Sequence, residues 1–430
     1  MPDCARCCLI LQIRAGREGG NLVKKREFAR RGIRLKTHKK VQKDLLTREG
    51  NIKFSLFILR PADIESARLF EEQEYKNALI PLDIFLKIDK LPFKVTADMM
   101  LDIAYWAVKL NSYQECGEFY KRIKSIKIND DTIRSIVNYI GEIVFKEYCK
   151  IANEIKVNLN KEAIRDKNKI DGILYLMIDG SALNTRKKDE NGSSWRENKL
   201  AVAFFSDNIY YLTDKHNEKQ HRIDKREYVS YIGNVDDFKY HVYALADRNG
   251  YRQYKNTVII SDGATWIRSI KEELFPDAQQ ILDLFHLKEN VYNYSKFIFN
   301  NNESKYEPWA KDICIILESG EWESVLNDIK IYTNKINTTS PCVNLQNYIL
   351  NNKNNIDYPL YKQQGFFVGS GAIESGNKIV LQNRLKLPGM RWNVPTAQFV
   401  LSLKAKVESR LWDSVVVPMV KRKLHEAEAD

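Results

Sequence analysis

Apolar runs that stop at an acidic residue recur in the middle of the chain. Gly172–Ile178 (GILYLMI) precedes Asp179, and Thr257–Ser261 (TVIIS) precedes Asp262. Short apolar runs with polar boundaries are typical of strands that are buried on both faces of a sheet. Three further segments have a strand pattern: Lys199–Phe205, Ile209–Thr213 and Gln280–Leu284. A tight turn at Asp207-Asn208 would join the first two of these as neighbouring strands.

Helical periodicity alternates with these strands. Apolar residues recur every three or four positions over Val235–Asp247 and Ala264–Leu274, and a third helix is predicted from about His286 to Phe299. Residues 301–365 are Asn-rich and lose the strand pattern, so we expect a helical insertion there. Three antiparallel strands, a helix and two strand–helix units follow in this order. That order predicts an α/β fold with an RNase H-like mixed sheet.

The N-terminal part of the chain has a different pattern. Residues 1–50 are polar and basic with several glycines, which predicts a weakly structured arm. A strand pattern over Ile52–Leu59 follows, and then two amphipathic helices over Ser112–Ile123 and Thr132–Phe145, the second capped by Asp130 or Asp131. This pair is either a helix-turn-helix or two ordinary helices of a small bundle.

These patterns divide the chain into five parts. The expected parts are a basic, weakly structured arm (1–50), a mainly helical region (51–165), an RNase H-like core (166–300 and 366–415), a helical insertion (301–365) and a C-terminal tail (416–430).

Composition narrows the class of protein. No segment approaches the ~20 apolar residues that a membrane helix needs, so we expect no membrane partner. Seven scattered cysteines favour a reducing compartment, and we expect a cytoplasmic protein. Cys4-x-x-Cys7 lacks a second ligand pair at zinc-finger spacing, which argues against structural zinc.

The net charge of +12 favours a polyanionic partner such as nucleic acid, although a Lys-rich composition alone could produce it. Basic residues crowd one short N-terminal stretch: Lys24, Lys25, Arg26, Arg30, Arg31, Arg34, Lys36, Lys39, Lys40 and Lys43.

Asp179 and Asp262 are candidate metal ligands. In an RNase H-like sheet the first and fourth strands are neighbours, so two acids at their ends would converge. Carboxylates hold divalent ions, and two ions roughly 4 Å apart can activate an attacking oxygen and stabilise a leaving one. Taken singly, an Asp at a strand end is more often a turn former or a helix cap.

Five motifs follow one another in order along the chain: MIDGS (177–181), SDGATW (261–266), DLFH (283–286), GSGAIESGN (369–377) and RLKLPGMRW (384–392). This set resembles the DDE transposases of bacterial insertion sequences, close to the Mutator-like group with its RNase H-like core. The resemblance extends from about Pro81 to Arg410.

The resemblance implies a role for each matching residue. Asp179 and Asp262 match the first two metal-binding acids, and Glu374 matches the third, carried on a helix after a helical insertion. Glu408 is a competing acid for that third position. His286, three residues after Asp283, would orient the scissile phosphate or a metal-bound water, unless it is a structural histidine. The implied cofactor is Mg²⁺ or Mn²⁺, with two ions.

The implied partner is double-stranded DNA, both the terminal inverted repeats of an element and a target. Candidate DNA contacts near the third acid are Lys378, Arg384, Lys386, Arg391 and Trp392. Those in the N-terminal region are Lys24, Arg30, Arg31, Lys39 and Lys40. Trp392 could equally be a core residue. Because two DNA ends must be paired, we expect a homodimer or a larger homo-oligomer. Two alternatives to a transposase stay open, a non-catalytic DNA-binding remnant or regulator and an RNase H-like nuclease without joining activity.

Overall fold

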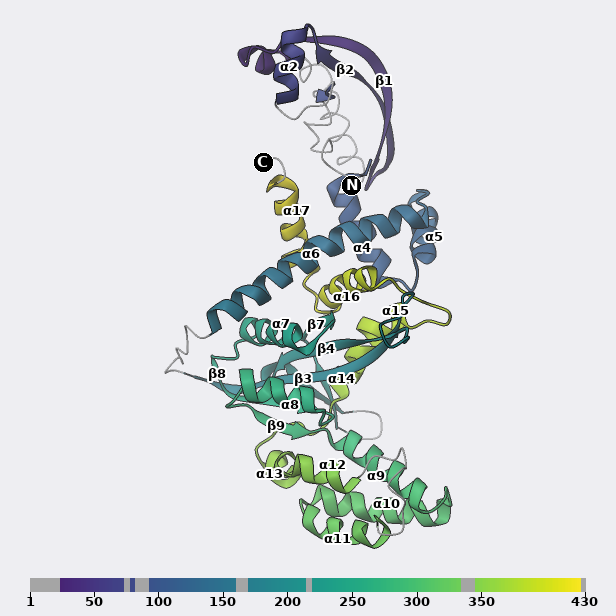
Figure 1. The fold of residues 1–430 in the computed structure, drawn as a ribbon, viewed down its shortest axis with the longest axis vertical. Coiled ribbons are helices and arrows are strands. Elements are labelled where there is room, and N and C mark those ends of the chain that lie inside the picture. The colour runs from purple at the N-terminus through teal and green to yellow at the C-terminus, as the bar shows by residue number, and fades with distance from the viewer. Residues whose placement is uncertain are drawn as a thin grey trace. The chain divides into compact units, whose positions relative to one another are not determined.

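The computed structural model describes residues 24–72, 78–81, 93–159, 169–213, 219–333 and 345–426 (Figure 1). Its backbone divides into two compact units, one of Met1–Ile143 with Trp412–Asp430 and one of Val144–Leu411. Cys4 and Cys7 lie outside the described residues. Within the described part of the chain, no helix is both long and apolar enough to cross a membrane.

The unit Val144–Leu411 is built on a mixed five-stranded sheet with the order β7-β4-β3-β8-β9. The strands are β3 (Ile170–Asn184), β4 (Trp195–Phe205), β7 (Glu227–Ile232), β8 (Tyr254–Ser261) and β9 (Gln279–Leu282). Strands β3, β4 and β7 pair antiparallel, whereas β3, β8 and β9 pair parallel. The predicted α/β class with a mixed sheet is confirmed.

Helices cover this sheet because the central strands are apolar on both faces. Leu176 and Ile178 of β3 are buried in one core with Phe238 of α7 (Val235–Arg248) and Ile267 of α8 (Thr265–Leu274). The C-terminal part of the unit contributes α14 (Gly371–Gly376), the π-helical η4 (Asn377–Gln382), α15 (Asn383–Leu385) and α16 (Val394–Glu408). The Gln398 side chain in α16 accepts a hydrogen bond from the Ile232 N–H and so fixes α16 against β7 (2.7 Å).

One predicted strand lies elsewhere. Ile209–Thr213 is strand β5, but it pairs with β6 (Lys219–Ile223) in a separate two-stranded ribbon, and β7 takes the expected place beside β4. Instead of a tight turn, the short 3-10 helix η2 (Ser206–Asn208) follows β4. The exposure of one tyrosine in each strand shows why β7, and not β5, lies beside β4. Tyr211 is 66% exposed, whereas Tyr228 of β7 is fully buried, so β7 offers the apolar contacts that an edge strand of the main sheet requires.

The predicted helical character of residues 301–365 is confirmed for the described part. The helices there are α10 (Glu303–Glu318), α11 (Trp322–Thr333), α12 (Leu345–Asn352), η3 (Lys353–Asn355) and α13 (Tyr358–Gln363), and α9 (Leu284–Ile298) precedes them. Two tyrosines join this segment to the sheet. The hydroxyl of Tyr348 donates to the carbonyl oxygen of Asp262 (2.7 Å), and that of Tyr358 donates to the carbonyl oxygen of Leu282 (3.1 Å).

The other unit contains an antiparallel hairpin and several helices. They are β1 (Leu35–Thr47), β2 (Gly50–Pro61), α2 (Ile64–Glu72), α4 (Ala97–Lys109), α5 (Tyr113–Lys124), the start of α6 (Asp130–Asn158), η5 (Trp412–Val416) and α17 (Val417–Glu426). The expectation of a weakly structured arm is therefore wrong for Leu35–Thr47, whose backbone pairs with β2. The expected C-terminal tail contains helix α17, and Lys421 of that helix forms an ion pair with Asp98 (2.9 Å).

The two amphipathic helices expected before the sheet are present as α5 and α6. Ser112 caps α5 by accepting the N–H of Glu115 (3.0 Å). The cap of α6 differs from the prediction, because Asn129 accepts the N–H of Thr132 (2.8 Å), while Asp130 lies in the first turn.

Candidate metal centre

Asp179 and Asp262 lie at the same end of two neighbouring strands. Asp179 is within β3, opposite Leu200 of β4, and Asp262 directly follows the last residue of β8. The parallel register pairs Met177 with Ile260, so the two acids are each two residues beyond a matched pair. The adjacency of their strands, expected from the sequence, is present in the structure.

Asp179 is partly buried and held by two hydrogen bonds. Its Oδ1 accepts the Gly180 N–H (2.8 Å), and its Oδ2 accepts a hydrogen from Nδ2 of Asn377 (2.5 Å). Burial raises the pKa of Asp179, and the negative charge of Asp262 raises it further, although the hydrogen bonds and His286 act in the opposite direction. A bound cation would offset this repulsion between like charges.

The backbone around Asp262 is fixed on both sides. Its Oδ1 accepts the N–H of Ala264 (2.9 Å), and its carbonyl oxygen accepts the Tyr348 hydroxyl. Gly263 has φ of +87°, and a Cβ there would lie 2.9 Å from the side chain of Asn352. The turn after β8 therefore needs glycine, both for its conformation and for the close approach of α12.

Asp283 and His286 form a hydrogen-bonded pair at the start of α9. Asp283 is fully buried; its Oδ2 accepts the hydroxyl of Ser370 (2.7 Å) and contacts Nδ1 of His286. The hydrogen bond with Asp283 raises the pKa of His286 to about 9 against the effect of burial, and the charges of Asp262 and Asp179 add to this increase. At neutral pH and without a metal, the imidazole therefore carries a positive charge.

Glu374 faces this pair from α14. Its Oε1 lies 3.0 Å from Oγ of Ser370. Ligand atoms of Asp283, His286 and Glu374 all lie within 4.8 Å of one another. Within the described residues, Asp179, Asp262 and Glu374 do not form a group of three at this spacing. The carboxylate of Glu374 thus lies with Asp283 and His286.

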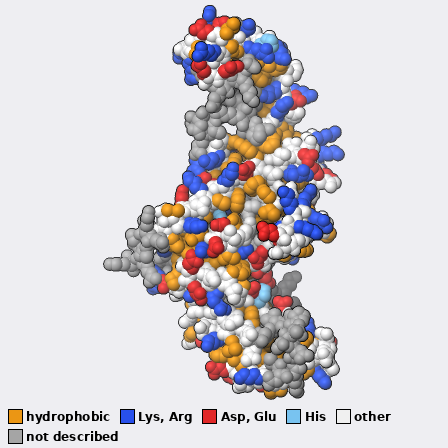
Figure 2. All heavy atoms as spheres, viewed as in Figure 1, with side chains coloured by type: hydrophobic (Ala, Val, Ile, Leu, Met, Phe, Trp, Pro, Cys, Tyr) orange, Lys and Arg blue, Asp and Glu red, His pale blue; other side chains and the backbone are white. Residues whose placement is uncertain are grey.

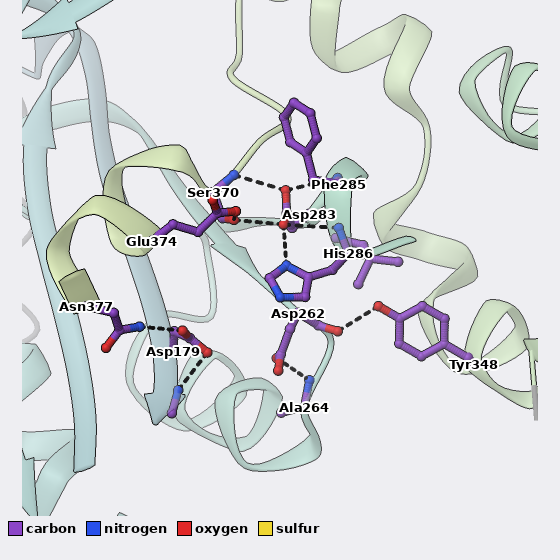
Figure 3. A network of polar contacts seen from close by, with 12 residues as sticks. Asp179, Asp262, Ala264, Asp283, Phe285, His286, Tyr348, Ser370, Glu374 and Asn377 are labelled. Atoms are coloured by element: carbon purple, nitrogen blue, oxygen red, sulfur yellow. Dashed lines mark hydrogen bonds and ion pairs between the residues drawn. The ribbon is translucent and has the colours of Figure 1, made fainter. Parts of the chain in front are cut away.

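Figure 3 shows how these side chains face one another. Asp179 and Asp262 lie on one side of the His286 ring, and Asp283 and Glu374 lie on the other. Carboxylate oxygens are donors that suit Mg²⁺ or Mn²⁺. The donor set and the repulsion between Asp179 and Asp262 both fit divalent cations.

Exposed basic residues lie in the segment between α14 and α16. Lys378, Lys386 and Arg391 are exposed, and Nζ of Lys386 donates to Oγ of Ser181 (3.2 Å). Backbone hydrogen bonds of Trp392 join the loop before α16 to the end of β3. Figure 2 shows Lys and Arg side chains gathered near the position of α15 in Figure 1.

Two of the predicted DNA contacts are buried. Arg384 is 1% exposed and Trp392 is 9% exposed, and the guanidinium of Arg384 lies 5.3 Å from the centre of the Trp392 ring. The indole N–H of Trp392 donates to the carbonyl oxygen of Leu385 (3.0 Å). The expectation of a DNA contact is wrong for Arg384 as it is placed, and Trp392 is a core residue.

The N-terminal candidates lie in the other unit. Arg30, Lys39 and Lys40 are exposed, whereas Lys24 and Arg31 both approach Glu27, at 2.7 and 3.5 Å. Lys24, Arg30 and Arg31 precede the hairpin, and Lys39 and Lys40 lie in β1.

Three hydrogen bonds hold the acids of the candidate site, and the sequence predicted none of them. Asn377 donates to Asp179, Ser370 donates to Asp283, and Tyr348 holds the backbone of Asp262. The role of Asn377 could have been found from its spacing, because it follows Glu374 by three positions and residues three apart share a helix face. No such signal exists for Tyr348, which comes from a helical segment distant in sequence. No protein-family model matches the chain, and no curated protein matches it significantly.

Proposed function

We propose that this protein is a DDE-type DNA transposase with an RNase H-like core. It would bind the terminal inverted repeats of its element, hydrolyse a strand at each end, and join the freed 3′-hydroxyl to target DNA. One observation carries most of the argument: Asp179 in β3 and Asp262 directly after the neighbouring parallel strand β8 lie at the same end of a sheet ordered β7-β4-β3-β8-β9. Glu374 lies nearby on α14, with its carboxylate beside Asp283 and His286. This order is the one expected of an RNase H-like sheet.

The residues would divide the work as follows. Asp179, Asp262 and Glu374 would hold Mg²⁺ or Mn²⁺, which when bound supplies charge neutralisation at the phosphate and activation of the attacking oxygen. His286, held by Asp283, would direct its positive charge towards a phosphate oxygen. Lys386 and Arg391 would contact the phosphodiester backbone, which positions the DNA strand without reading its sequence.

DNA binding would extend to the N-terminal unit. Lys39 and Lys40 are exposed on β1, and a two-stranded β-ribbon can enter the major groove of DNA. Desolvation lowers the pKa of His38, and the charges of the neighbouring cations Arg60, Lys39 and Lys36 lower it further. We propose a homodimer or larger homo-oligomer on DNA in the bacterial cytoplasm, since two element ends must be cut together.

Cleavage of the gene's own flanking DNA tests this proposal. The purified full chain would be incubated with Mg²⁺ or Mn²⁺ and duplexes that contain the two flanking sequences, with Asp262→Asn as the control. We expect cuts at defined ends and joined products from the wild type, and neither from the variant. Cuts without joined products would indicate a nuclease, and binding without cuts would indicate a non-catalytic DNA-binding protein. Either result contradicts the transposase assignment.

A further inference from the structure

Asn377 lies between two acidic residues of the candidate site, because it contacts Asp179 and follows the helix that carries Glu374. It is the first residue of the π-helical segment η4, directly after α14, which carries Glu374. Single π-helical turns widen the helix locally and are frequent at functional sites. Gly376 precedes it, and a Cβ at Gly376 would lie 2.7 Å from the ring of Tyr228. The helix is therefore pressed against the sheet at the point where Asn377 begins.

This placement brings the amide of Asn377 to Asp179. Nδ2 of Asn377 lies 2.5 Å from Oδ2 of Asp179, and the Gly180 N–H lies 2.8 Å from Oδ1 (Figure 3). Each carboxylate oxygen thus accepts one hydrogen bond and keeps lone-pair capacity for a cation. The amide fixes the orientation of the carboxylate without adding a charge that would compete with a metal.

Packing alone does not account for an asparagine at this position. The side chain is only 5% exposed, and its Oδ1 is buried without a hydrogen-bond partner among the described residues. A buried polar atom without a partner is unfavourable, and leucine would fill a similar volume without one. The benefit of the amide must therefore come from its Nδ2–H group, whose acceptor is Asp179.

We propose that Asn377 is a positioning residue that holds the carboxylate of Asp179 in the orientation that binds a divalent cation, and links that orientation to the helix of Glu374. This inference rests on the proposed function, because it assigns Asp179 to a metal site. Residues that orient metal ligands from behind typically contribute 10- to 100-fold to metal affinity or activity.

Calorimetric titration of the full chain with Mn²⁺ tests the inference. The proteins are the wild type, Asp179→Asn, Asn377→Leu and the matched control Asn383→Leu, which makes the same change at an exposed position. We expect Asn377→Leu to weaken Mn²⁺ binding roughly 10- to 100-fold, and Asn383→Leu to bind as the wild type does. In DNA cleavage, kcat of Asn377→Leu should fall while KM for the DNA stays unchanged. Circular dichroism and the Tm establish folding, and Asn377→Ala, which removes the same donor without adding bulk, replaces the leucine variant if that one does not fold.

The outcomes separate the two proposals. If Asp179→Asn loses Mn²⁺ affinity while both Asn377 variants bind within twofold of the wild type, the positioning role is wrong and the metal site stands. If the wild type does not bind Mn²⁺, or Asp179→Asn binds it equally well, the metal assignment fails and the role of Asn377 fails with it. A fall in Tm without a change in Mn²⁺ affinity would show that Asn377 only ties the helix to the sheet.

Discussion

Two clusters of charged residues on the same sheet are arranged in opposite ways. At one, Asp179 and Asp262 lie close enough that the charge of Asp262 raises the pKa of Asp179, which burial has already raised. At the other, Glu227 of β7 lies 2.6 Å from Arg248 and 3.0 Å from Lys406, and these cations lower its pKa to about 2 although burial opposes them.

The contrast distinguishes a cluster suited to binding a cation from a cluster that stabilises the fold. Cations next to a buried carboxylate stabilise its ionised form. The Glu227 cluster therefore needs no further group to balance its charge. The Asp179 cluster gathers like charges and is stabilised by an added cation. We therefore expect substitutions in the first cluster to change activity and substitutions in the second to change the free energy of unfolding.

The largest effect should come from Asp179→Asn. If a metal ligand is lost, DNA cleavage should fall on the order of 10³-fold, because roughly 4 kcal/mol of transition-state stabilisation disappears. The Tm without metal should stay the same or rise, since the variant removes a carboxylate whose ionisation is disfavoured in the folded state. Single-turnover cleavage and thermal unfolding measure the two quantities. A large fall in Tm would show that Asp179 has a structural role.

Lys406→Met should change the other quantity, the free energy of unfolding. Lys406 is 3% exposed, and its loss leaves Glu227 with one cation fewer in a buried place and removes the contact with the Tyr148 ring, 4.0 Å away. We expect a loss of about 4 kcal/mol in the free energy of unfolding. Lys255→Met removes an exposed pair with Asp171 and should cost less than about 1 kcal/mol. Urea denaturation compares them, and equal losses would contradict the distinction between buried and exposed pairs.

The sequence anticipated the Asp179 cluster far better than the Glu227 cluster. Apolar runs ending at Asp179 and Asp262 locate two buried strands, because burial on both faces demands an uninterrupted apolar pattern. Glu227 and Ser230 interrupt that pattern in β7, so the strand was missed and β5 was expected in its place. Ser230 is accommodated by its hydrogen bond to Asn198 of β4 (2.6 Å), a contact that only the folded sheet reveals.

Side-chain direction was the other quantity that the sequence could not supply. Arg384 lies in a basic segment and was expected on the surface, yet the helix turns it onto Trp392. The position of Glu374 near Asp283 and His286 likewise depends on the loop that Asp283 anchors through Ser370. The pattern of residue types locates helices and strands. The direction in which a single side chain points depends on packing between segments that are distant in sequence.

Acid should destabilise the protein in two steps. His241 is buried near Arg248 and Lys406, and burial together with these charges lowers its pKa to about 4, although Asp237 acts in the opposite direction. In the unfolded chain its pKa is near 6.5, so the unfolded state binds the proton first as pH falls from 6.5 to 4, and stability decreases by about 3 kcal/mol. Glu227, with a pKa of about 2 in the fold, adds a comparable loss as pH falls from 4.5 to 2.

Urea denaturation at a series of pH values measures these steps. His241→Phe should remove most of the decrease between pH 6.5 and 4 and leave the lower step in place, whereas Glu227→Gln should remove the lower one. If His241→Phe retains the full decrease between pH 6.5 and 4, another group titrates there and the assignment is wrong.

The smallest effect concerns the exposed cations beside the acids. Lys386 and Arg391 are exposed, and if both contact phosphates, the double variant Lys386→Ala/Arg391→Ala should reduce the slope of log affinity against log salt by about 2, because each neutralised phosphate releases about 0.9 counterion. The loss of affinity should be similar for all DNA sequences, since phosphate contacts carry no sequence information. Lys255→Ala, an exposed cation on β8, is the matched control and should leave the slope unchanged. Fluorescence anisotropy at several salt concentrations gives the slopes. An unchanged slope in the double variant would mean that neither residue contacts a phosphate of the bound DNA.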